Sequence, residues 1–139
     1  MVCVVAVIAL LAAILLPAIP RATSRARLEA FALEAASVLT TDRSEAMRRH
    51  EQVVTAVSAA ARSIRSGATG RLVRVPPDVV FDAVLPARCN QRPSFSTISF
   101  FASGMSCGGS IILTRLGAGY EIRVNWLTGG VDVVAHNGR

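Results

Sequence analysis

The first twenty residues carry no charge, and this feature constrains the chain more than any other. Residues 1–16 form an unbroken apolar run, MVCVVAVIALLAAILL, which residues 17–20 extend without adding charge. All 15 basic and 9 acidic residues of the 139-residue chain follow it. A helix rises about 1.5 Å per residue, so about 20 residues cross a hydrocarbon layer about 30 Å thick. The chain therefore divides into an apolar N-terminal segment and a polar domain behind it.

Three interpretations of the apolar run compete. A cleaved secretory signal needs a basic stretch before the run and a small-residue cleavage site, and the sequence offers neither. The length of the run argues against a buried core helix. Because the run is apolar on every face, it suits lipid, and we expect a membrane anchor that Pro17 kinks or ends.

The charge behind the run bears on orientation and on partners. Arg21, Arg25 and Arg27 follow it closely, so the positive-inside rule would place the C-terminal part in the cytoplasm. The net charge is +6, and all 15 basic residues are arginine. This balance permits contact with nucleic acid or anionic lipid and demonstrates neither.

Residues 25–50 are expected to form a second helical stretch. An apolar stripe at helical period is made by Leu28, Phe31, Ala35 and Val38. A second possibility is that Asp42 caps a new helix, with Glu45 at the third helical position. In both cases a helical rod runs from the membrane to about Arg49.

Beyond residue 51 the apolar period changes from 3.6 to 2, which indicates strands. Strands are expected at residues 52–58, 63–65, 71–75, 79–85, 96–102, 110–115, 120–126 and 131–135. Residues 103–109 are interpreted as a Gly-rich hairpin loop, and glycines at 117–119 and 128–130 as turns. The expected fold class is α+β with a small antiparallel sheet or sandwich. The chain divides into a membrane segment at 1–20, an amphipathic half-helix at 21–50 and a β-rich head at 51–139.

No arrangement of residues predicts catalysis. His50 and His136 are the only histidines, and neither has a Cys or carboxylate at metal-ligand spacing. The glycines at 104–109 lack the lysine and following helix of a phosphate loop, and Gly-x-Ser-x-Gly does not occur. We therefore expect no enzyme, no cofactor, no metal and no small-molecule substrate.

The cysteines of the head leave two possibilities open. Cys89 and Cys107 flank the strand expected at 96–102 and both stand in loop-like sequence. In an oxidising compartment they could form a disulfide, which would stabilise the fold by about 3 kcal/mol in the chain-entropy description. The alternative is two free, partly buried thiols.

Two segments of the chain resemble known families. The run VVAVIALLAAILLPAI resembles the N-terminal helix of type IV pilin-like proteins, including the proline after it. The stretch GGSIILTRLGAGYEIRVNWLTGGVDV resembles the end of the GspH/FimT family, the minor pseudopilins of type II secretion and minor pilins of type IV pili. Its signature positions here are Gly108, Gly109, Trp126, Leu127, Thr128 and Gly129. Residues 42–49 also resemble the helix end of that family.

The resemblance implies a type IV pilin-like fold and a structural role. The N-terminal helix would hold the subunit in the bacterial inner membrane by a single pass, with the head in the periplasm. It would then pack with the helices of other subunits in a filament core. The residues expected to make these contacts are Val4, Val5, Ile8, Leu11, Leu15, Leu16 and Pro17. Family members begin with a basic leader and a peptidase site, so we expect Met1 to be an internal methionine, and the leader would remove the orientation conflict.

Two functions follow from the resemblance. The first is a minor pseudopilin of the type II secretion pseudopilus. The alternative is a minor type IV pilin that assists pilus assembly or binds DNA during uptake. The candidate DNA contacts near the first expected hairpin are Arg62, Arg65, Arg71 and Arg74. The competing interpretation of these arginines is a solvated strand face, because DNA binding requires them to be clustered on one exposed face.

Overall fold

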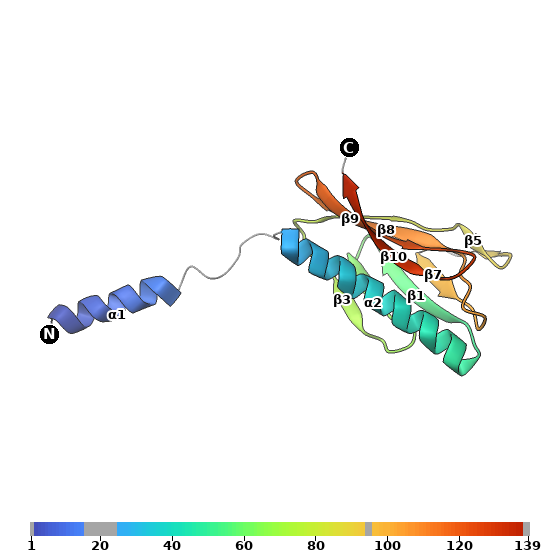
Figure 1. The fold of residues 1–139 in the computed structure, drawn as a ribbon, viewed down its shortest axis with the longest axis horizontal. Helices are drawn as coiled ribbons and strands as arrows, with labels where there is room; N and C mark the ends of the chain where they lie inside the picture. Colours follow the sequence, from blue (N-terminus) through green and yellow to red (C-terminus); the bar gives the residue numbers. More distant parts are fainter. Residues whose placement is uncertain (1, 16–24, 94–95, 138–139) are drawn as a thin grey trace.

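The computed structural model describes residues 2–15, 25–93 and 96–137. Helix α1 spans Val2–Leu15 and helix α2 spans Arg25–Arg49 (Figure 1). The strands are β1 (Val53–Ser58), β2 (Ser63–Arg65), β3 (Leu72–Arg74), β4 (Val80–Val84), β5 (Arg88–Cys89), β6 (Arg92–Pro93), β7 (Thr97–Phe100), β8 (Gly109–Arg115), β9 (Ala118–Val124) and β10 (Val131–Asn137).

Helix α1 is apolar along its whole length. Its Val4, Val5 and Ile8 side chains are exposed, and Leu11 and Leu15 belong to the same helix. Within the described residues, neither helix combines the length and the apolar character that a bilayer crossing requires. Leu16, Pro17 and the join between the two helical segments of the expected rod lie outside the described residues.

Helix α2 is continuous for 25 residues and buries the expected apolar stripe. Leu28, Ala35 and Val38 are almost completely buried, and Phe31 packs against the core at its edge. The small side chains on this face allow strands to approach closely, and α2 contacts β1, β8, β9 and β10. The period of 3.6 therefore predicted the correct face of the helix.

Two four-stranded antiparallel sheets pack against this one helix (Figure 1). The first, sheet A, has the order β3-β2-β1-β7, and the second, sheet B, has the order β10-β9-β8-β4. Among the described residues, strands β5 and β6 pair only with each other. Ile98 and Phe100 of sheet A share a fully buried core with Ile111 and Ile122 of sheet B. All eight expected strands are present, with small differences in their bounds.

One expectation about a loop is corrected, and one hairpin is added. Residues 103–109 do not join two paired strands: after a tight turn closed by a single antiparallel bridge between Phe100 and Ser106, they lead from β7 in sheet A to β8 in sheet B. Gly108 and Gly109 have φ values of +84° and +146°, which let the chain change sheets there. The β5–β6 hairpin was not expected, because strands of two residues, one of them containing Pro93, are too short to show alternation.

Asp42 is not a helix cap but a buried residue in the middle of α2. The hydroxyls of Thr55 and Ser66 each donate to its carboxylate at 2.5 Å. The backbone N–H groups of Gly67 and Ala68 donate to it at 3.0 and 3.3 Å. A buried carboxylate is costly unless donors surround it, and these four donors all come from sheet A and its β2–β3 turn. The helix continues through Asp42 because the sheet satisfies this side chain.

The β2–β3 turn reaches the carboxylate only because position 67 is glycine. A Cβ added at Gly67 would lie 2.0 Å from the carbonyl oxygen of Val54. Any side chain would push the turn away from β1 and withdraw the two backbone donors from Asp42.

The variant Asp42→Asn should lose about 2–4 kcal/mol of folding free energy. The amide is neutral and cannot accept from all four donors with either orientation. The measurement is urea unfolding of the detergent-solubilised chain, followed by circular dichroism. Asp82→Asn is the control, because Asp82 is exposed and accepts the N–H of its neighbour Ala83, so its change should stay within about 0.5 kcal/mol. Equal losses in the two variants would contradict the role given to Asp42.

Candidate functional site at the β9–β10 turn

The turn between β9 and β10 is built around Asn125. Its side-chain oxygen accepts the backbone N–H groups of Leu127 and Thr128 at 2.8 and 3.2 Å. Its carbonyl accepts the N–H of Gly129 at 2.7 Å. An Asn side chain that holds the backbone two residues ahead gives a compact, well-defined turn. The turn presents Trp126 and Leu127 to solvent, with 64% and 56% of their surfaces exposed.

Gly129 lets this turn touch the β7–β8 crossover. Its φ is +72°, and a Cβ there would lie 1.7 Å from the carbonyl oxygen of Gly104. Arg43 of α2 bridges the two segments, because its Nε donates to the Gly104 carbonyl at 3.1 Å and its Nη2 to the Thr128 carbonyl at 3.0 Å. A helix side chain therefore clamps both loops at once.

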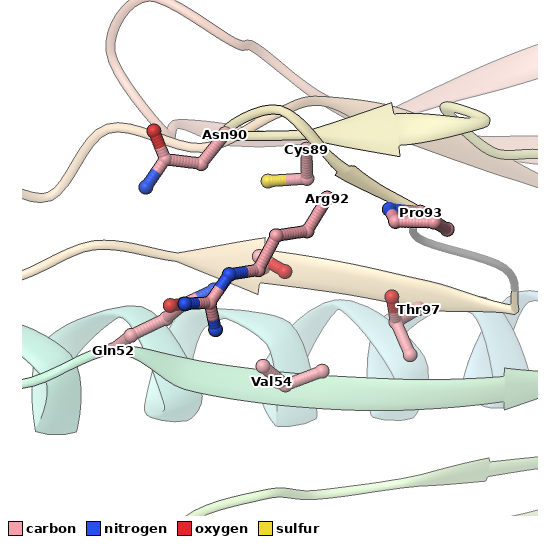
Figure 2. Close-up of a pocket in the computed structure, with 8 residues that line it drawn as sticks. Gln52, Val54, Cys89, Asn90, Arg92, Pro93 and Thr97 are labelled. Atoms are coloured by element: carbon pink, nitrogen blue, oxygen red, sulfur yellow. The ribbon is translucent and has the colours of Figure 1, made fainter.

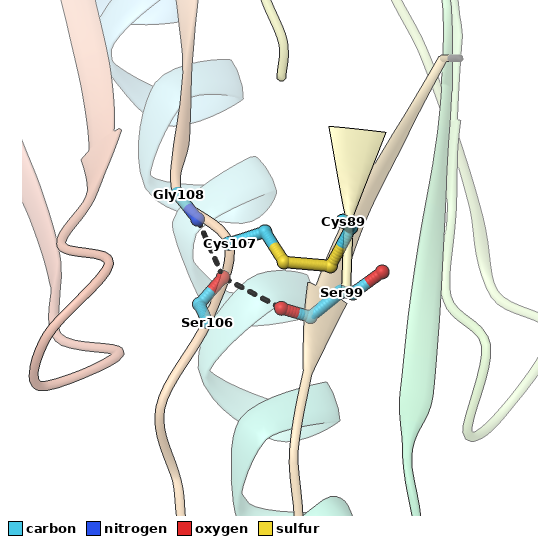
Figure 3. The surroundings of a disulfide bond; sticks show 5 residues. All are labelled: Cys89, Ser99, Ser106, Cys107 and Gly108. Atoms are coloured by element: carbon cyan, nitrogen blue, oxygen red, sulfur yellow. Dashed lines mark hydrogen bonds between the residues drawn. A yellow bond between two sulfur atoms is a disulfide. The ribbon is translucent and has the colours of Figure 1, made fainter. Parts of the chain in front are cut away.

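The crossover is held by further hydrogen bonds and by a disulfide (Figure 3). The Ser106 backbone N–H donates to the Trp126 carbonyl at 3.2 Å. The Ser106 hydroxyl donates to the Ser99 carbonyl at 2.6 Å and accepts the Gly108 N–H at 3.1 Å. A side chain at Gly108, where φ is +84°, would meet the Cβ of Trp126 at 3.3 Å. These contacts fix the backbone on which Trp126 stands.

Cys107 of the crossover is joined to Cys89 of β5 by a disulfide (Figure 3). The two Cα atoms are 5.7 Å apart, and Cys89 is buried. Of the two states that the sequence left open, the structure contains the bonded one. It ties the β5–β6 hairpin to the segment that carries the signature glycines.

The exposed apolar side chains at this end of the head are Trp126, Leu127 and Met105. On the last turns of α2, Glu45 pairs with Arg48 and with Arg49, the latter at 2.9 Å. Hydrogen bonding by Arg48, together with the charges of both arginines, lowers the pKa of Glu45.

The four arginines proposed for DNA contact do not share one exposed face. Arg62 turns inward, where its guanidinium donates to the carbonyls of Pro76 and Val79. Arg71 pairs with Glu34 of α2 at 2.9 Å. Arg65 and Arg74 are exposed on the outer side of β2 and β3, whereas the exposed Arg71 lies on the side of α2.

The histidines and carboxylates of the head belong to the side-chain types that bind metal ions in proteins. In the described ranges no group of three or more His, Cys, Asp and Glu side chains could hold a metal ion. On sheet B, Nδ1 of His136 lies 3.8 Å from Oε2 of Glu121. His50 follows α2 at the surface. The pKa of Glu121 is lowered mainly by its hydrogen bond from Arg123.

The sequence pointed to the glycines and to Trp126, offered Asp42 only as a possible helix cap, and gave Arg43 no role. A signal for Asp42 was available. The buried positions of α2 run through Val38, Leu39, Asp42 and Ala46, so this carboxylate occupies the apolar stripe itself. Arg43 carried no such signal, because its carbonyl partners are 61 and 85 residues away.

Comparison with known proteins identifies the family. A family model described as type II transport protein GspH matches residues 32–130. The chain belongs to this family. The expected resemblance is thereby confirmed, and the matched range contains most of α2, all of sheet A, strands β4, β8 and β9 of sheet B and the signature turn.

Solved structures share the fold of this GspH family member at low sequence identity. The minor pseudopilin EpsH from the type 2 secretion system of Vibrio cholerae matches with a TM-score of 0.60 and 11% identity, covering 78% of this chain and 96% of that one. The type IV minor pilin FimU of Pseudomonas aeruginosa matches with a TM-score of 0.58 and 16% identity, covering 81% and 91%. The search of curated proteins gave no significant match. The α+β, pilin-like fold class is confirmed.

The variant Gly129→Ala should lose about 3 kcal/mol or more, because the added methyl meets the Gly104 carbonyl and φ is positive. Gly117→Ala is a matched control at the β8–β9 turn, where φ is +78° and nothing lies within 4 Å of the added atom. The control should lose only about 1 kcal/mol, the cost of the backbone conformation alone. Thermal unfolding of both variants measures the difference. Similar losses would mean that the contact with Gly104 does not matter.

Proposed function

We propose that this chain is a minor pseudopilin, a structural subunit of the pseudopilus that serves type II secretion. The observation that carries the proposal is membership of the GspH family over residues 32–130. The similarity to the fold of EpsH, described as a minor pseudopilin of a type 2 secretion system, supports it. The proposed role of the subunit is structural, and it requires no catalytic residues.

The apolar residues 1–20 would anchor the subunit in the inner membrane, with the head in the periplasm. Support comes from α1, which is apolar along its length and exposes the side chains of Val4, Val5 and Ile8. Lipid and the interior of a helix bundle are similarly apolar, so such a helix could move from one to the other at little cost. The Cys89–Cys107 disulfide fits an oxidising compartment for the head.

The rigid β9–β10 turn would form a contact with another subunit. Trp126 and Leu127 are exposed apolar side chains on a backbone that Asn125, Gly129 and Arg43 hold in place. Aromatic anchors on a preorganised surface lose little conformational entropy on binding and often dominate interface energies.

Deletion of the gene in its native bacterium tests the proposed system. We expect the loss of proteins exported through type II secretion from the culture medium, with pilus-dependent motility and DNA uptake unchanged. Complementation with the wild-type gene should restore export. Normal export together with lost pili or lost DNA uptake would contradict the proposal and favour the minor type IV pilin.

Replacing Trp126 and Leu127 together by alanine should weaken subunit association about tenfold or more without changing thermal stability. Leu116→Ala is the control, because Leu116 is an apolar residue 88% exposed on the β8–β9 turn, away from the proposed contact. Cross-linking in whole cells, with complex recovery from detergent extracts, measures association. An undiminished yield of cross-linked complexes in the double variant would rule out this turn as the contact.

A further inference from the structure

A surface pocket of about 420 Å³ lies between sheet A and the β5–β6 hairpin (Figure 2). Its lining residues are Gln52, Val54, Cys89, Asn90, Arg92, Pro93, Thr97 and Ser99. Val54 and Ser99 are register partners whose neighbours Val53 and Ile98 point into the core. The pocket therefore occupies the face of sheet A opposite the hydrophobic core.

The hairpin over the pocket is fixed from outside itself. Asn90 and Gln91 form its two-residue turn with φ values of +54° and +65°, and only two residue pairs make its ladder. An isolated hairpin of this size is not stable in water. The disulfide from Cys89 to Cys107 attaches it to the crossover, so one wall of the pocket is held in place covalently.

The pocket contains one cation and no acid. Figure 2 shows Arg92 extending from β6 across the pocket toward Gln52 and β1. Elsewhere on the head, Arg71 and Arg123 pair with carboxylates. Arg92 has no such partner within the described ranges. Arg92 is solvent-exposed and lines the polar pocket with no carboxylate among the described lining residues.

The lining groups match a carboxylate. A guanidinium presents parallel N–H donors that fit the two oxygens of a carboxylate. The side-chain amides of Gln52 and Asn90 can each add a donor, while Val54 and Pro93 offer apolar walls for a carbon stem. A phosphate carries more charge than one arginine balances, so the single cation favours the carboxylate.

We propose that this pocket binds a carboxylate carried by a peptide chain, with Arg92 as the anion-binding residue. The carboxylate can belong to an acidic side chain or to a C-terminus, which present the same two oxygens. In a fibre a neighbouring subunit would supply it, and this part of the inference rests on the proposed function. Binding of a free peptide does not depend on that role.

Titration of the full chain in detergent micelles with short peptides, followed by nitrogen-15 NMR, tests the pocket. Two peptides separate the sources of the carboxylate: N-acetyl-Gly-Glu-Gly-amide carries only a side-chain carboxylate, and N-acetyl-Gly-Gly-Gly only a terminal one. N-acetyl-Gly-Gln-Gly-amide is the uncharged control, and inorganic phosphate is the competing anion. We expect saturable shifts of the Gln52 and Asn90 side-chain amide signals with at least one carboxylate peptide, and none with the control.

Arg92→Gln should weaken peptide binding about tenfold or more, the usual range for losing a charge-assisted pair. Arg88→Gln is the matched control, because Arg88 is exposed on β5 of the same hairpin and does not line the pocket. It should leave binding within about twofold. Unchanged circular dichroism and thermal unfolding in both variants exclude loss of fold.

Three results would overturn the inference: no saturable shift with either carboxylate peptide, equal losses in Arg88→Gln and Arg92→Gln, or tighter binding of phosphate than of both peptides. Failure of the proposed function is seen separately. Peptide binding in a chain whose gene deletion leaves export intact would refute the secretion role and keep the pocket. Loss of export on gene deletion, combined with no peptide binding, would support the secretion role and refute the pocket.

Discussion

Two consecutive residues of α2 hold the two halves of the head. Asp42 accepts four hydrogen bonds from sheet A and its β2–β3 turn. Arg43 donates to the crossover and to the β9–β10 turn of sheet B. Neighbouring helix positions point about 100° apart, so a single turn of helix can address both sheets. Because the carboxylate is buried, its energy depends on all four donors being in place, and the position of sheet A follows from this requirement.

The exposed end of the head depends on the same clamp. Trp126 would be a poor binding group on a loose loop, since ordering that loop would oppose association. Here Asn125, Gly129 and Arg43 fix the turn before any partner arrives. The pocket beside Arg92 is also held by a distant residue: the Cys89–Cys107 disulfide fixes the β5–β6 hairpin, as Arg43 fixes the β9–β10 turn. In both places, a flexible segment is made rigid by a residue distant in sequence.

The sequence predicted features that repeat locally and missed those that depend on distant contacts. The stripe at Leu28 and Val38 and the alternation of β1 are periodic, so the helix face and the strands could be predicted. The β5–β6 hairpin is too short for any period. The partnership of Asp42 with Gly67 joins residues 25 positions apart, and no local pattern encodes it. The signature glycines were recognised from family resemblance, while the reasons for them required the structure: a Cβ at Gly129 would meet the Gly104 carbonyl, and one at Gly108 would meet the Cβ of Trp126.

The adjacency of Asp42 and Arg43 also determines how the head responds to mechanical load. Force applied along the axis of α2 enters both sheets at the same helical turn, through a carboxylate on one side and a guanidinium on the other. At this turn the helix is hydrogen-bonded directly to segments of both sheets. The head would therefore be displaced as a solid body when its helix is pushed, instead of yielding one sheet at a time.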